Sequence, residues 1–216
     1  MSSIRAILFD ADGVVQRTPS DWIDRVGKLC GQPDRAQAFV EAVFATEQAS
    51  LIGEGNFEED LQALLQSWGS PSVLDQALEL WTLMEPDAEV LDFIDTLRSG
   101  GFIVGLASNQ QSYRSEFMSG TLNYASAFDY LFYSHDLGEK KPSRRYFQLI
   151  CDVLALEPTQ IVFIDDHQAN VDAAVGVGLR ACQYHLSEGM HQLQKRLAPW
   201  VGWLGVDSPG QTGERF

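Results

Sequence analysis

The sequence is poor in basic residues and has no long apolar run. It holds 15 Lys and Arg against 30 Asp and Glu, a net charge of −15 at pH 7, and it has no basic run of five residues or more. Such a surface repels polyanions, so we expect neither nucleic acid nor an anionic membrane as a partner. No uncharged apolar run approaches about 18 residues, so we expect no membrane-spanning helix.

Cysteine is scarce as well. Cys30, Cys151 and Cys182 are an odd number, and no Cys-x-x-Cys pair occurs. This pattern favours neither a disulfide framework nor a zinc site, and it is typical of reduced, buried thiols. The first apolar run is short and ends at Asp10, which does not fit a secretory signal. We therefore expect a cytoplasmic protein.

What the sequence does hold is enough apolar material for a large core, at 45% of its 216 residues. Five short apolar runs have the continuous character of strands that are buried on both faces. These runs are 4–9, 102–108, 130–134, 161–165 and 179–185. Helical periodicity separates most of them, as in 87–101, 141–156 and 167–178. The alternation predicts an α/β fold with a doubly wound parallel sheet.

One interval, residues 16–86, breaks the alternation, because it contains only helical patterns. We expect four helices there, enough to bury a small core of their own. The chain would then divide into a core of 1–15 and 87–216 and an inserted helical cap of 16–86. Asn56, with Glu59 three residues later, predicts a helix start. The preceding loop, 51–57, fits either a plain helix–helix turn or a segment that reaches the substrate.

Polar residues follow each of the first four predicted strands. In an open parallel sheet, the loops at the carboxyl ends of the strands form the ligand crevice. In chain order these residues are Asp10, Asp12 and Gly13, then Ser108 and Asn109, then Lys140 and Lys141, then Asp165 and Asp166. Each group alone also suits a turn or a helix cap. Their convergence at one edge of the sheet favours a site for a phosphate and a divalent cation.

Four stretches carry a resemblance to a known family. They are FDADGVV, ASN, KKPSRRYF and FIDDHQANVDAA, in this order and spread over nearly the whole chain. Together they resemble the haloacid dehalogenase-like (HAD) hydrolase superfamily, in particular its members with a small helical cap after the first motif, and they are similar to bacterial sugar-phosphate phosphatases. The resemblance implies a Rossmann-like core and Mg²⁺-dependent hydrolysis of a small phosphate monoester through an aspartyl-phosphate. The substrate would be a phosphorylated metabolite, with a sugar phosphate as one candidate.

The resemblance also assigns a role to each motif residue. Asp10 would be the nucleophile, and Asp12 the general acid for the leaving oxygen and then the general base for water. The residues implied to bind phosphate are Ser108, Asn109 through its backbone, and Lys141. The residues implied to hold Mg²⁺ are Asp10, Asp12 through its carbonyl, Asp166 and the neighbouring Asp165.

The charge balance of this group leads to a further expectation. Four aspartates carry −4 if all are ionised, whereas Mg²⁺ and Lys141 supply +3. The imbalance favours one protonated carboxyl, and we expect it at Asp12, which must donate a proton. An all-oxygen ligand set suits Mg²⁺ better than zinc.

Three alternatives stay beside the phosphatase. A phosphomutase of the β-phosphoglucomutase type shares all four motifs. A haloacid dehalogenase is the second, and the presence of Asp12 disfavours it, because family members that remove halide lack an acid at this position. A catalytically silent module of the same fold is the third. The sequence leaves open which substrate is used and whether the protein is a monomer or a homodimer.

Overall fold

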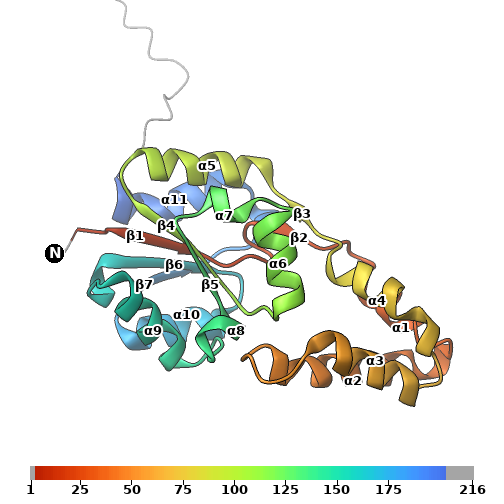
Figure 1. The fold of residues 1–216 in the computed structure, drawn as a ribbon. Helices are drawn as coiled ribbons and strands as arrows, with labels where there is room; N and C mark the ends of the chain where they lie inside the picture. The colour runs from red at the N-terminus through yellow and green to blue at the C-terminus, as the bar shows by residue number, and fades with distance from the viewer. Residues whose placement is uncertain (1–2, 203–216) are drawn as a thin grey trace, which may run out of the picture.

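The fold is built on a five-stranded parallel sheet, seen in a computed structural model that describes residues 3–202. The strands are β1 (Ala6–Phe9), β4 (Ile103–Ser108), β5 (Tyr130–Tyr133), β6 (Ile161–Asp165) and β7 (Arg180–Gln183). Their order is β5-β4-β1-β6-β7, with β1 at the centre between β4 and β6 (Figure 1). The predicted α/β fold and all five predicted strands are therefore confirmed. The central position of β1 places its carboxyl end, and so Asp10, in the middle of the crevice edge.

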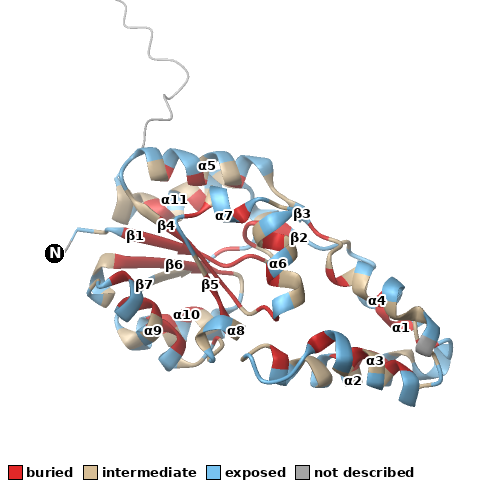
Figure 2. Cartoon of the chain, viewed as in Figure 1, coloured by how far each residue is buried: buried red, intermediate tan, exposed pale blue. Residues whose placement is uncertain are grey.

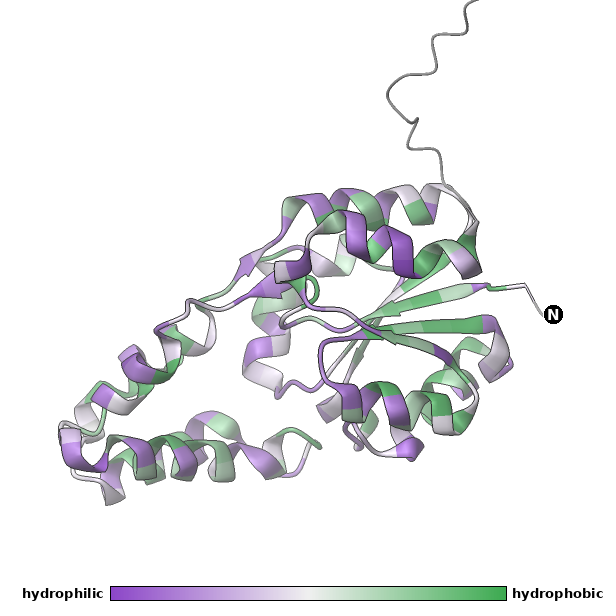
Figure 3. Ribbon diagram, turned by 180° about the vertical axis from the view of Figure 1, so that it is seen from behind, coloured by the Kyte–Doolittle hydropathy of each residue, from purple (hydrophilic) through white to green (hydrophobic). Residues whose placement is uncertain are grey.

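Helices cover both faces of the sheet (Figure 1). One layer holds α5 (Ala88–Ser99), α6 (Ser112–Gly120), α7 (Tyr124–Ala127) and α11 (Met190–Val201), and the other holds α9 (Arg144–Leu154) and α10 (Gln168–Val177). Alternate side chains of β1 enter different cores: Ile7 and Phe9 pack under the first layer, Ala6 and Leu8 under the second. Burial on both faces is why the strands read as continuous apolar runs (Figures 2 and 3).

The interval between β1 and β4 contains the four expected helices. They are α1 (Trp22–Lys28), α2 (Ala36–Ser50), α3 (Phe57–Ser67) and α4 (Leu74–Trp81). They share a hydrophobic cluster of their own, which includes Phe39, Leu61 and Trp81. A two-stranded antiparallel ribbon, β2 (Gln16–Arg17) with β3 (Glu85–Pro86), lies where the chain leaves the core and returns to it.

The start of α3 and the loop before it have clear local causes. The Asn56 side chain accepts hydrogen bonds from the backbone N–H groups of Glu58 (2.9 Å) and Glu59 (3.1 Å), which caps the helix as predicted. In the loop, Gly53 has φ +76°, and a Cβ there would lie 2.6 Å from the carbonyl oxygen of His135 in α8 (Ser134–Leu137). The loop therefore lies against α8, which follows β5 of the parallel sheet.

The C-terminal helix α11 was not predicted. Its Leu193 and Leu197 are buried in the same cluster as Ile7 of β1, and Trp200 packs against that cluster, so the segment covers a sheet face. Trp203 and the polar tail from Asp207 lie outside the described residues. Short 3-10 turns complete the chain at Pro33–Arg35, Pro71–Val73, Pro158–Gln160 and Leu186–Glu188. Within residues 3–202, the helices are too short or too polar for any of them to span a bilayer.

Candidate active site

A buried lysine joins two aspartates at the centre of the crevice. The Lys141 Nζ lies 2.8 Å from the Asp10 Oδ1 and 2.6 Å from the Asp165 Oδ2, and all three side chains are at least nine-tenths buried. The ends of β1 and β6 supply the aspartates, and the loop before α9 supplies the lysine. The Asp10 Oδ1 also accepts the backbone N–H of Ala11 at 2.7 Å. The three side chains carry a net charge of −1 when all are ionised.

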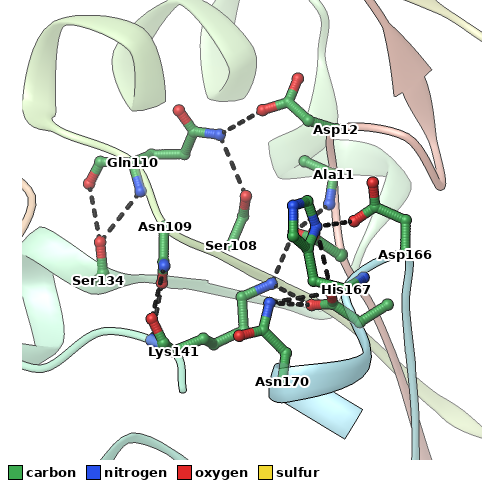
Figure 4. A network of polar contacts seen from close by, with 12 residues as sticks. Ala11, Asp12, Ser108, Asn109, Gln110, Ser134, Lys141, Asp166, His167 and Asn170 are labelled. Carbon is green, nitrogen blue, oxygen red and sulfur yellow. Dashed lines mark hydrogen bonds and ion pairs between the residues drawn. The ribbon is translucent and has the colours of Figure 1, made fainter. Parts of the chain in front are cut away.

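Asp165 acts as an anchor for its neighbours. Besides Lys141, its carboxylate accepts the backbone N–H of His167 (2.8 Å) and the Asn170 Nδ2, which lies 2.9 and 3.0 Å from its two oxygens (Figure 4). Both oxygens therefore have donors, and the same side chain fixes the start of α10. The N-cap position of α10 is His167, without a side-chain capping bond, so Asp165 holds the helix start through His167 and Asn170 and not as a helix cap.

Asp166 faces the loop that follows β1. Gly13 in that loop has φ +78°, and a Cβ on it would lie 2.5 Å from the Asp166 Oδ2, so only glycine leaves room for the carboxylate. The other oxygen, Oδ1, is 2.6 Å from the Nδ1 of His167, whose side chain is exposed (Figure 4). The hydrogen bond to Asp166 raises the pKa of His167.

Asp12 is held by three side chains that the sequence did not single out. Its Oδ1 accepts from the Gln16 Nε2 (2.9 Å) and the Arg114 Nη2 (2.7 Å), and its Oδ2 accepts from the Gln110 Nε2 (3.0 Å). The buried Tyr124 hydroxyl donates to the Gln16 Oε1 at 2.9 Å, which orients that amide. Gln110 directly follows the predicted Ser108-Asn109 pair, whereas Arg114 lies in a helix with no motif. The carboxyl of Asp12 thus has one fixed orientation.

Without a metal ion, these surroundings shift the pKa values of Asp10 and Asp12 in opposite directions. Burial, with the Asp165 charge, raises the pKa of Asp10 to about 7, although Lys141 opposes the shift. Burial acts on Asp12 as well, but the Arg114 guanidinium and the amides of Gln16 and Gln110 lower its pKa overall. The expectation that Asp12 holds the shared proton counted Mg²⁺ among the charges, and for the metal-bound site it stays a prediction. Without the ion, Asp10 is the better holder, because it lies between a second carboxylate and the apolar core.

Ser108 and Asn109 close the other side of the site. The Ser108 Oγ accepts from the Gln110 Nε2 at 3.1 Å. Asn109 forms a reciprocal pair with the backbone of Lys141: the Lys141 N–H donates to Oδ1 (2.8 Å), and Nδ2 donates to the Lys141 carbonyl (2.9 Å). A cavity of about 360 Å³ opens here, lined by Asp10, Asp12, Ser108, Asn109, Lys141, Pro142, His167, Ala169 and Asn170. Loops after four strands thus meet at one cavity, as the sequence predicted.

The residues present fit a hard divalent cation. One ligand atom each of Asp165, Asp166 and His167 lies within 4.8 Å of the others. The oxygens of Asp165 already accept donors from Lys141, His167 and Asn170, whereas the Oδ2 of Asp166 lies over Gly13. Asp10 and the carbonyl of Asp12 are the further oxygen ligands that the family resemblance implies. An all-oxygen set of this kind suits Mg²⁺.

Comparison with known proteins identifies the class. Residues 4–178 match the family model described as haloacid dehalogenase-like hydrolase. The chain belongs to this family of hydrolases, which confirms the resemblance carried by the four motifs.

The individual proteins that resemble this chain share less than a quarter of their aligned residues with it. The phosphoglycolate phosphatase of Aquifex aeolicus is 23% identical over 186 residues, 82% of this chain and 83% of that protein. The N-acetylmuramic acid 6-phosphate phosphatase of Pseudomonas aeruginosa is 23% identical over 214 residues, 95% of this chain and 92% of that one. A HAD family enzyme of Bacteroides thetaiotaomicron, solved in complex with magnesium and inorganic phosphate, superposes with a TM-score of 0.75 at 19% identity, covering 88% of this chain and 99% of that one.

Proposed function

We propose that the chain is a Mg²⁺-dependent phosphatase that hydrolyses a small phosphate monoester through an aspartyl-phosphate on Asp10. The observation that carries the proposal is the buried contact of Lys141 with Asp10, beside an Asp12 whose carboxyl is held in one orientation. The names of two similar phosphatases and the magnesium and phosphate in a similar structure support it. A sugar phosphate is one candidate substrate.

In the first step, a carboxylate oxygen of Asp10 attacks phosphorus. The new O–P bond forms as the bond from phosphorus to the leaving oxygen breaks, and Asp12 gives its proton to that oxygen. A phosphate beside Asp12 favours the protonated form that this step needs. Lys141 and the Ser108 hydroxyl bind phosphoryl oxygens. Mg²⁺, held by Asp10, Asp166 and the carbonyl of Asp12, would supply positive charge at the transferred group.

In the second step, Asp12 acts as a base. Its carboxylate takes a proton from water, and the water oxygen attacks phosphorus. The bond between phosphorus and the Asp10 oxygen breaks, inorganic phosphate leaves, and both aspartates return to their starting states. The leaving oxygen of the first step and the water of the second step occupy the same position. One side chain can therefore give the proton in the first step and take it in the second, and we assign both roles to Asp12.

Residues 16–86 would form a cap that opens and closes over this site on the β2–β3 ribbon. Two contacts between cap and core support this proposal: the Gly53 loop against His135, and the Lys140 ammonium with the Gln48 side chain of α2. Closure excludes bulk water from the aspartyl-phosphate, and opening releases product.

The test is hydrolysis of p-nitrophenyl phosphate with Mg²⁺ and with EDTA. Asp10→Asn should abolish turnover while the circular dichroism spectrum stays unchanged, and the wild type should form a BeF₃⁻ adduct at Asp10. Near-full activity of Asp10→Asn would contradict the covalent mechanism. Isomerisation of a sugar bisphosphate without phosphate release would select a mutase, and halide release without Mg²⁺ a dehalogenase. If no substrate is converted and no BeF₃⁻ adduct forms, the protein is a catalytically silent module.

A further inference from the structure

One acidic residue of the cap, Glu47 on α2, is bonded to the cap cluster, and Tyr113 of the core helix α6 packs against the same cluster. The Glu47 Oε1 accepts the indole N–H of Trp81 at 3.0 Å, and Trp81 belongs to the cap cluster. Burial raises the pKa of Glu47, while the Arg114 charge and the Gln111 amide, both from the core, lower it. Glu47 therefore belongs to the part of the cap that packs against α6, the helix that carries Arg114.

The core presents donors toward this carboxyl. The Gln111 Oε1 accepts the backbone N–H of Arg114 at 2.9 Å and so caps α6. This bond identifies Oε1 as the oxygen that caps α6, so the Nε2 of Gln111 remains as a donor for another partner. Among the described residues, Nε2 of Gln111 and Nε of Arg114 are buried without a hydrogen-bond partner. Buried donors without partners are costly, and a carboxylate brought beside them reduces that cost.

Arg114 connects the two carboxylates. Its Nη2 lies 2.7 Å from the Asp12 Oδ1 and 3.9 Å from the Met84 Sδ, and its neighbour Tyr113 packs against the cap cluster. A long arginine side chain keeps one conformation only when partners hold it on more than one side. Asp12 supplies one partner, and Glu47 is the acid available on the other side. The charges that act most strongly on Glu47 are those of Arg114 and Asp12.

We propose that Glu47 is a positioning residue for the general acid: with the cap closed, it holds Arg114, and Arg114 in turn holds the Asp12 carboxyl toward the leaving oxygen. The inference rests on the proposed phosphatase function and adds a cap residue to it. Proton donation is then fully effective only while the cap excludes water. Glu47 itself touches neither the phosphoryl group nor the reacting atoms.

The test compares two substrates of similar shape. Phenyl phosphate has a poor leaving group that needs a proton, whereas p-nitrophenoxide departs without one. The ratio kcat/KM covers the steps up to formation of the aspartyl-phosphate. Glu47→Gln should lower kcat/KM for phenyl phosphate by about ten- to hundredfold, since misplacing a catalytic group has effects of this size. For p-nitrophenyl phosphate the loss should stay within about threefold.

A matched control and a second variant sharpen the result. Glu41→Gln removes an exposed carboxylate from the same helix, which accepts a hydrogen bond from the Gln37 side chain, and should leave kcat/KM unchanged for both substrates. Arg114→Lys keeps the charge but loses the forked geometry, and should show the same selective loss as Glu47→Gln. If the two residues act as a unit, the double variant should lose little more than the worse single variant.

Two outcomes overturn the inference. An equal loss for both substrates would show a merely structural effect of Glu47, and no loss for either would show that Glu47 does not act on Asp12. Failure of the proposed function looks different: the wild type would then show no Mg²⁺-dependent hydrolysis of p-nitrophenyl phosphate, or Asp10→Asn would keep its turnover.

Discussion

Replacing Asp10 by asparagine should stabilise the metal-free protein at neutral and alkaline pH, although it removes the nucleophile. Asp10 is 7% exposed and shares Lys141 with a second buried carboxylate, Asp165. With both carboxylates ionised, the three groups carry −1 in a medium that solvates charge poorly. Asparagine has nearly the same shape and stays neutral, so the group then carries no net charge.

The sign and size follow from the pKa of Asp10, which rises from 3.8 to about 7, mainly because of burial. Between these values the folded state holds a proton that the unfolded state has released. The contribution of Asp10 to stability is therefore fully present below about pH 4 and is lost as pH rises through about 7. The whole shift corresponds to about 4 kcal/mol. The asparagine side chain does not ionise, so the variant does not lose this unfolding free energy as pH rises.

The assay is urea unfolding in EDTA at pH 5, 6, 7 and 8. The free energy of unfolding of Asp10→Asn minus that of the wild type should grow by about 2–3 kcal/mol from pH 5 to pH 8 and level off above pH 7. Thr96→Ala, at an exposed position of α5 without a titratable group, should give a difference that stays constant with pH. A constant difference for Asp10→Asn as well would refute the reasoning, because it would mean that Asp10 ionises as easily in the fold as in water.

Three further predictions concern the surroundings of the site and the cap. Lys141→Met should destabilise the metal-free protein by about 3–5 kcal/mol at pH 8, because it leaves two buried carboxylates without a counter-charge; a urea midpoint equal to that of the wild type would contradict this. Gly13→Ala should lower stability and abolish Mg²⁺-dependent activity, since its Cβ would collide with Asp166, whereas Gly101→Ala, also at positive φ but with open space around it, should cost only about 1–2 kcal/mol and keep activity. Asn56→Ala should cost about 1 kcal/mol of unfolding free energy through loss of the α3 cap, and an unchanged thermal midpoint would count against that capping bond.

Much of the core could be predicted because its signals are local. The three central strands, β1, β4 and β6, read as continuous apolar runs since they are buried on both faces, and β6 matched its predicted range from Ile161 to Asp165 residue for residue. The four cap helices carried periodic apolar residues that meet in one cluster. Helix α6 gave no such signal, because only Ser115 and Met118 of its nine residues are buried. That helix nevertheless carries Arg114.

The division of labour between Asp165 and Asp166 also needed the structure. Adjacent in sequence, they offer the same chemistry to a reader of motifs. In space, Asp165 points into the core toward Lys141 and Asn170, and Asp166 points over Gly13. Successive side chains at the end of a strand face opposite directions, so one becomes an anchor and the other keeps an oxygen free.

The sequence by itself determined the strands, the core helices α5, α9 and α10, and the loops that bring Asp10, Asp12 and Lys141 to one edge, because these depend on residue periodicity and on the chain order of the strands. Only the tertiary structure decided which neighbours surround those groups. Arg114 reaches Asp12 from 102 positions away and Gln110 from 98. Nearby charges and burial decide which carboxyl holds a proton. The distances between these groups are set by tertiary packing and not by any local sequence pattern.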